Sequence, residues 1–297
     1  MKHWNTRYPE RFNLDTGEDY KKWREEKLAS YPKNVGDLVV ELGDMTSLTK
    51  GEKSKIMELV ELANMCVYTA GAADLSMDSL LALGKQLGVS DTDKARRHSN
   101  SDELTNSRIL NSAIPFTTRN VRWHTDATYY GSDKTIQALF LLCKRPAVEG
   151  GSNKVLDNEI LYILLRDKNP DALRVLMNQN CFKYRNPKTG EIAENLGGKV
   201  FWANADGNLC HRFSFRKMDM AWSEDADVTA ARAALESMIQ EESEYVIEGR
   251  LESGLGLISN NVLHTREKLV DSDNPERTRL LFRARFYDRV GLQQLTM

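Results

Sequence analysis

The chain has 297 residues, and its 41 Lys and Arg side chains nearly balance 43 Asp and Glu side chains. This length allows one large domain or two small ones with a buried core, and it does not by itself imply an enzyme. The balanced charge excludes the strongly basic character typical of nucleic-acid-binding domains, so we expect no nucleic-acid partner. No apolar run reaches the roughly 18 residues of a membrane span, and the start lacks a signal-peptide core. We therefore expect a cytoplasmic protein without a membrane partner.

The first third of the chain predicts mainly helical structure. Residues 1–35 are polar with scattered aromatic side chains, which fits an extension lying on a larger body. Within residues 36–110, Thr49 and Glu52 form a capping-box pattern ahead of apolar residues at helical spacing, and a second helical pattern ends at Gly88. The polar, aperiodic residues 91–111 predict a mobile loop and a candidate lid.

From residue 111 onward the pattern favours short strands. They are expected at residues 121–125, 136–143, 182–184, 200–203, 209–215, 255–263 and 279–287. Helices are expected after Asp157, after Asn169 and over residues 227–240. Many short strands with two helical insertions favour an antiparallel barrel or jelly roll flanked by helices over a parallel sheet. We treat residues 1–297 as one domain whose jelly-roll core covers 111–297.

The four cysteines are widely spaced and form no CxxC pair, which argues against a thiolate zinc site and a disulfide framework. Cys66 and Cys143 lie in apolar runs. We interpret both as buried, inert thiols.

Two candidate metal ligands stand at the end of the first expected strand. His124 and Asp126 are two residues apart in WHTD. Side chains two apart on a strand project from the same face, so this pair can bind one metal ion. The pair alone is weak support, because a solvated polar pair at such spacing arises readily by chance.

The best third ligand is His264, which ends another expected strand in LISNNVLHTRE. Two histidines and one carboxylate on one face of octahedral Fe(II) leave three positions open, which suits a bidentate 2-oxo acid plus O2. Such a triad would also serve a zinc hydrolase.

An arginine row follows in RTRLLFRARF. Alternation places Arg279, Leu281, Arg283 and Arg285 on one face of a strand. Such a row is more often a solvated sheet edge. Next to an iron site, Arg279 or Arg283 would instead anchor the distal carboxylate of 2-oxoglutarate, because a guanidinium grips a carboxylate in bidentate fashion.

Four ordered segments resemble the taurine dioxygenase superfamily of Fe(II)/2-oxoglutarate enzymes, which includes clavaminate synthase. These segments are WHTD, RPAVEGGSN, NNVLHTRE and RTRLLFRARF, between Trp123 and Tyr287. The resemblance implies a double-stranded β-helix and oxidation of an unactivated C–H bond, usually by hydroxylation, with Fe(II), 2-oxoglutarate and O2. Homo-oligomers are frequent in this family, so the resemblance allows one here.

Carried over by position, the resemblance implies that His124, Asp126 and His264 bind iron and that Arg279 pairs with the C5 carboxylate of 2-oxoglutarate. Arg283 then faces the co-substrate or the primary substrate. Where the family often has Thr, this chain has Asn153, whose amide could donate instead of a hydroxyl.

The sequence says less about the primary substrate. Arg212 and Arg216 are either surface charges or a positive pair that faces an anionic or zwitterionic small molecule. Two other functions remain open: a zinc-dependent hydrolase using the same triad, and a non-catalytic jelly-roll binding protein. The chain lacks an HExxH motif for the former, and the intact triad argues against the latter. The presence of Asp126 argues against a halogenase.

Overall fold

The computed structural model describes residues 4–71, 74–93, 103–105, 117–128, 130, 135–185, 189–216 and 219–291. Contacts divide the chain into two compact units. The first comprises Met1–Tyr31, Arg122–Thr135 and Leu156–Val246, and the second comprises Pro32–Val121, Ile136–Val155 and Ile247–Met297. In the described part, no helix combines the length and the apolar character that a membrane crossing needs.

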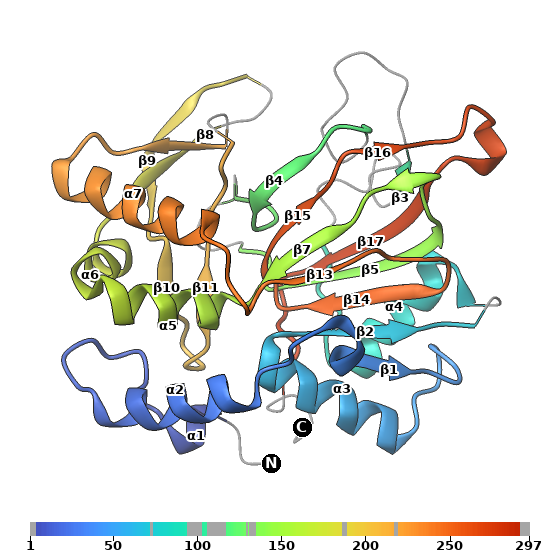
Figure 1. The fold of residues 1–297 in the computed structure, drawn as a ribbon, viewed down its shortest axis with the longest axis horizontal. Coiled ribbons are helices and arrows are strands. Elements are labelled where there is room, and N and C mark those ends of the chain that lie inside the picture. The colour runs from blue at the N-terminus through green and yellow to red at the C-terminus, as the bar shows by residue number, and fades with distance from the viewer. Residues whose placement is uncertain are drawn as a thin grey trace. The chain divides into compact units, whose positions relative to one another are not determined.

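The first unit combines helices with small sheets (Figure 1). Its helices are α1 (Trp4–Arg7), α2 (Glu18–Ser30), α5 (Asn158–Lys168), α6 (Pro170–Asn178) and α7 (Ala226–Gln240). One sheet has the order β12 (Met220–Trp222), β8 (Phe182–Arg185) and β9 (Ile192–Gly198), and another pairs β10 (Phe201–Ala203) with β11 (Leu209–His211).

The second unit is built on a six-stranded sheet (Figure 1). Its order is β1 (Val39–Glu41), β2 (Met65–Thr69), β14 (Leu255–Ser259), β5 (Ala138–Arg145), β17 (Leu280–Phe286) and β3 (Glu103–Thr105). All neighbours are antiparallel except β1 and β2. The helical elements are η1 (Val35–Leu38), α3 (Lys50–Ala63), α4 (Met77–Gln86) and η6 (Pro275–Arg277). One face of β5 carries Leu139, Leu141 and Cys143, which pack against Leu281.

A four-stranded sheet has the order β13 (Ile247–Gly249), β7 (Asn153–Leu156), β15 (Leu263–Arg266) and β4 (Val121–His124), and β16 (Leu269–Val270) pairs with β6 (Glu149–Gly150). A turn follows β6. Gly150 has φ +66°, and a Cβ there would come within 2.3 Å of the Lys268 carbonyl oxygen, so glycine is required.

The expected helix starts are confirmed. Thr49 accepts a hydrogen bond from the Glu52 N–H, while the Glu52 carboxylate accepts from the Thr49 N–H, which closes the capping box of α3. Asp157 caps α5, and Asn169 caps α6 with Pro170 at its first position. The chain is thus mixed α and β, as expected.

Two expected strands are wrong in extent. The run 255–263 is two strands, because Asn261 adopts the left-handed conformation with φ +50° and its side-chain amide donates to the Ile136 carbonyl. This turn sends β14 into the six-stranded sheet and β15 into the four-stranded one. The strand expected over 209–215 ends at His211.

Only part of the loop predicted at residues 91–111 can be compared with the structure. Residues 94–102 and 106–111, which include most of the candidate lid, lie outside the described residues. Glu103–Thr105 forms β3 rather than loop. Residues 36–110 thus add strands to the sheet as well as the expected helices.

The N-terminal residues pack on the first unit, as their aromatic side chains suggested. Phe12 and Trp23 both contact the ring of Tyr162 on α5, with ring centroids 5.2 and 6.4 Å apart, respectively. Both cysteines interpreted as inert are buried and free. Burial raises the pKa of the Cys143 thiol to about 11.

Candidate metal centre

The first candidate ligand stands at the end of β4, which is hydrogen-bonded to a partner on each side. On one side β4 borders β15 in the four-stranded sheet. On the other, the Thr125 N–H donates to the Phe213 carbonyl at 2.9 Å, and His124 forms a bridge with Ser214. Ala127 then adopts φ +60°, so the chain turns sharply just after Asp126. Backbone pairing therefore fixes the position of His124.

His124, Asp126 and His264 each offer a ligand atom, and these atoms all lie within 4.8 Å of one another. The His124 Nε2 lies 3.5 Å from the Asp126 Oδ1. Two metal–ligand bonds of roughly 2 Å can span about 4 Å, so one ion can reach both atoms. Asp126 is buried, and both histidines are partly buried. These are the three residues predicted from the sequence.

Hydrogen bonds to the backbone orient both imidazoles. The Nδ1 of His124 lies 2.9 Å from the Arg122 carbonyl oxygen, and the Nδ1 of His264 lies 2.9 Å from the Val262 carbonyl oxygen. A carbonyl only accepts, so each Nδ1 carries a hydrogen, and in the neutral form of each ring the lone pair is on Nε2. This arrangement orients metal-binding histidines in proteins generally. The donor set of two imidazoles and one carboxylate thus fits an Fe(II) ion.

The arginines of the closing strand are buried rather than solvated. Arg279, Arg283 and Arg285 are each at most 9% exposed. Arg285 is paired with Asp93 at 2.6 Å, and Arg283 has an interaction partner of its own. A register shift between Leu280 and Leu281 interrupts the strict alternation expected from Arg279 onward.

Arg279 differs from the other two arginines in its side-chain contacts. Its backbone N–H donates to the Asp271 carboxylate at 2.7 Å, but within the described residues its guanidinium has no hydrogen bond or ion pair. Burial lowers the pKa of Arg279. A buried cation in this condition is matched chemically by an anionic ligand.

A second buried guanidinium, Arg266, interacts electrostatically with Arg279. Burial, and then the charge of Arg279, lowers the pKa of Arg266 to about 10. Its Nη2 donates to the carbonyls of Thr117 and Arg119, at 2.6 and 2.5 Å. The sequence argument did not single out Arg266, although period-2 spacing from His264 on β15 was the available signal.

The other predicted residues have partners of different kinds. Asn153 is half-buried, and its Nδ2 donates to the Gly151 carbonyl at 3.2 Å. Arg212 is buried, donates to Thr135 Oγ1 at 2.5 Å and to the Tyr184 hydroxyl, and lies over the Trp202 ring. Their ligand contacts stay predictions.

Arg216 is half-buried, and its Nε lies 3.7 Å from the Asp219 carboxylate. Arg122 was not singled out. It is exposed, and its guanidinium lies 4.8 Å from the Phe215 ring centroid. Strand alternation places it on the same face of β4 as His124, which was the available signal.

A family model described as "Taurine catabolism dioxygenase TauD, TfdA family" matches residues 29–285. The chain belongs to this family. Two curated relatives are called uridine-5'-phosphate dioxygenase. The one from Streptomyces sp is 29% identical over 170 residues, covering 54% of this chain and 60% of the relative. The one from Amycolatopsis sp is 26% identical over 171 residues, covering 57% and 61%. The matched region thus spans about three fifths of each relative.

Solved structures with the same fold include non-heme iron oxygenases. OrfP in complex with Fe has a TM-score of 0.61 at 14% identity, covering 80% of each chain. OrfP with Fe and alpha-ketoglutaric acid has a TM-score of 0.60 at 15% identity, covering 83% of this chain and 82% of OrfP. An asparagine oxygenase in complex with Fe(II) has a TM-score of 0.58 at 9% identity, covering 84% and 93%.

Proposed function

We propose that this protein is an Fe(II)/2-oxoglutarate-dependent dioxygenase that hydroxylates a C–H bond of a small anionic or zwitterionic molecule. The observation that carries the proposal is the triad His124, Asp126 and His264, in which each imidazole is hydrogen-bonded to the backbone through Nδ1. Membership of the TauD, TfdA family supports the same chemistry. The pairing of the six-stranded and four-stranded sheets as a jelly roll is part of this proposal.

The three ligands would hold Fe(II) on one face and leave the remaining positions for co-substrates. With iron bound, O2 and 2-oxoglutarate supply the oxidation: a C–H becomes C–OH while 2-oxoglutarate gives succinate and CO2. Arg279 would bind the C5 carboxylate, because its buried guanidinium lacks an acidic partner among the described side chains. Arg266 would add positive potential for the same dianion.

An anionic substrate is supported by two observations. Arg122 shares a strand face with His124, and in the described part of the chain it makes no ion pair. A guanidinium there could hold an anionic group two residues along the strand from the metal. The names of the relatives suggest a phosphate-bearing nucleoside as one candidate. Arg216 and the buried Arg212 remain proposed substrate contacts.

The two alternative functions have less support. In a zinc hydrolase Arg279 and Arg266 would have no role. A binding protein would not require two histidines whose rings are oriented by backbone hydrogen bonds. Neither alternative gains support from the relatives or the solved structures.

Anaerobic reconstitution with Fe(II) and 2-oxoglutarate tests the proposal. We expect the weak visible charge-transfer band of the iron chelate in the wild type. His264→Ala should abolish it, because a ligand is lost, whereas His3→Ala removes a histidine that the proposal does not use and should keep it. Fe(II) binding without a band in the wild type would contradict the proposal and favour a 2-oxoglutarate-independent mechanism.

A further inference from the structure

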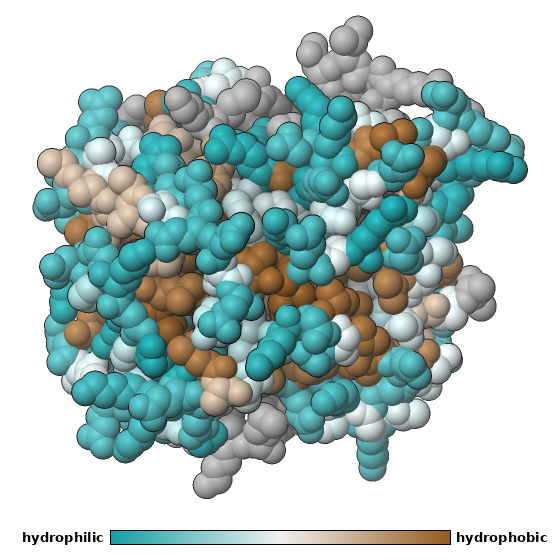
Figure 2. Space-filling model, viewed as in Figure 1, coloured by the Kyte–Doolittle hydropathy of each residue, from teal (hydrophilic) through white to brown (hydrophobic). Residues whose placement is uncertain are grey.

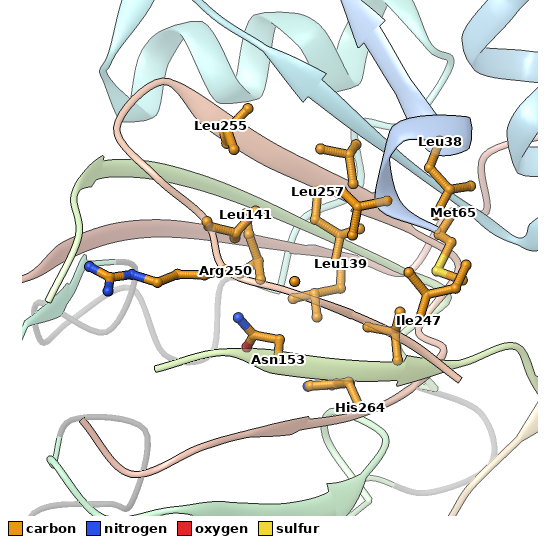
Figure 3. A pocket seen from close by; sticks show the side chains of 15 residues that line it. Leu38, Met65, Leu139, Leu141, Asn153, Ile247, Arg250, Leu255, Leu257 and His264 are labelled. Carbon is orange, nitrogen blue, oxygen red and sulfur yellow. The ribbon is translucent and has the colours of Figure 1, made fainter. Parts of the chain in front are cut away.

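A cavity of about 60 Å³ lies within the second unit (Figure 3). It is lined by residues of β2, β5 and β14 on one side and of β7, β13 and β15 on the other, with η1 at its edge. The lining residues are Val35, Leu38, Met65, Val67, Leu139, Leu141, Asn153, Val155, Ile247, Gly249, Arg250, Leu251, Leu255, Leu257 and His264. All but three of these are apolar or glycine.

The charged group of the lining has its partners elsewhere, and the amide has one of its two N–H donors in use. The Arg250 Nη2 donates to the Ala147 carbonyl at 2.5 Å, and its Nε lies 3.1 Å from Glu252. Figure 3 shows its guanidinium directed away from the leucines. The Asn153 amide donates to the Gly151 carbonyl. The cavity therefore offers no free charge for a carboxylate, which makes it a poor site for 2-oxoglutarate or a zwitterion.

The cavity reaches both the metal-binding residues and the surface. His264, the proposed distal iron ligand, forms part of its wall (Figure 3). At the other end, Val35, Leu251, Leu255 and Leu257 are half-buried. Figure 2 shows apolar residues gathered over β13 and β14 among hydrophilic ones. A small apolar molecule could thus pass from solvent to the His264 ring.

We infer that this cavity binds dioxygen and conducts it to the metal centre. The inference rests on the proposed function, in which O2 is the one apolar reactant. Apolar cavities stay dry and take up apolar molecules such as xenon, so a diatomic gas fits both the lining and the volume. The leucine wall would also keep water from entering by the same route.

Xenon binding to the metal-free protein tests the site without any catalysis. Methyl NMR under xenon pressure should shift the signals of Leu141, Val155 and Leu257 more than argon does. Leu257→Trp fills the cavity from β14 and should abolish these shifts, whereas the volume-conserving Leu257→Met should keep them. Val155→Phe fills it from β7 and provides a second test if Leu257→Trp does not fold.

The matching kinetic test follows succinate release from 2-oxoglutarate without primary substrate, at varied O2. The filled variants should raise the KM for O2 by roughly tenfold, which corresponds to about 1.4 kcal/mol. Their anaerobic iron–2-oxoglutarate band should equal that of Leu257→Met. Absence of xenon shifts in the wild type, or a wild-type KM for O2 in filled variants that retain the band, would overturn the inference. A wild type that binds xenon but forms no band would instead overturn the proposed function.

Discussion

Two buried cations, one in each unit, have opposite surroundings. In the first unit, Lys27 is fully buried, and its Nζ lies 2.7 Å from Asp157 and bonds to Glu159. Arg11 completes this cluster, 3.9 Å from Glu159. In the second unit, the Arg279 guanidinium is buried without a hydrogen bond or ion pair to any described residue.

This difference is what we expect between a structural charge and a charge that binds a ligand. Burying a charge costs several kcal/mol unless partners compensate for the lost water. Lys27 has two carboxylate partners that belong to the chain, so the charge is satisfied once the protein folds. Arg279 has no such partner among the described side chains, and in the proposed function a bound carboxylate compensates its charge. Substitutions should therefore act on stability at one position and on binding at the other.

The largest expected effect is on stability, for Lys27→Met. The substitution leaves two buried carboxylates without their cation, and we expect the free energy of unfolding to fall by about 3–5 kcal/mol. Chemical denaturation measures this change. Lys22→Met on the same helix removes an exposed ion pair with Glu18 and should leave the free energy of unfolding almost unchanged. Equal losses for the two variants would contradict a structural role for the buried cluster.

Arg279→Leu should show the reverse pattern. Removing a buried cation that lacks a protein partner should leave the free energy of unfolding unchanged or raise it. The affinity for 2-oxoglutarate should fall roughly a hundredfold, or about 2.7 kcal/mol, because a charge-assisted carboxylate contact is lost. Anaerobic titration of the iron–2-oxoglutarate band gives this affinity.

Two variants control for Arg279→Leu. Arg279→Lys keeps the charge but loses the guanidinium fork, so we expect an intermediate affinity. Arg283→Leu identifies the anchor: a larger loss of 2-oxoglutarate affinity in this variant than in Arg279→Leu would move the role to Arg283. A large loss of stability in Arg279→Leu with unchanged affinity would mean that Arg279 is structural.

Local geometry was enough to propose two of the three candidate metal ligands. Period-2 spacing placed His124 and Asp126 on one face at a strand end, and His264 was chosen because it ends another expected strand. That β4 and β15 are neighbours depends on long-range strand pairing, which no local pattern determines. The family motifs supplied that link.

Other features depend on tertiary contacts, for which the sequence contains no local pattern. The pairing of Arg285 with Asp93 joins residues far apart in the chain. The register shift at Leu280 leaves no signal in an alternating pattern. The turn at Asn261 had a local signal, since Asn tolerates the left-handed conformation, but the apolar residues around it favoured one long strand.

A smaller effect is expected at His211, another buried basic group, which lies on β11 in the first unit. Its ring stacks on Phe201 at 4.3 Å, and its Nδ1 lies 3.2 Å from the Asn158 side-chain oxygen. Its Nε2 has no hydrogen-bond partner among the described residues. Burial without an acidic partner lowers the pKa of His211 to about 3, so this group stays neutral in the folded state.

This lowered pKa makes stability depend on pH. Between about pH 3 and the ordinary histidine pKa near 6.5, the unfolded chain binds a proton at His211 that the folded chain does not, so falling pH favours unfolding. From pH 7.5 to 5.5 this residue should reduce the free energy of unfolding by about 1.4 kcal/mol. His211→Phe keeps a stacked ring and should lack this part of the decline when denaturation is measured at both pH values. If the free energy of unfolding fell equally in the two proteins, His211 would be charged in the folded state. A buried base in this unit could then keep its charge without carboxylates like those that surround Lys27.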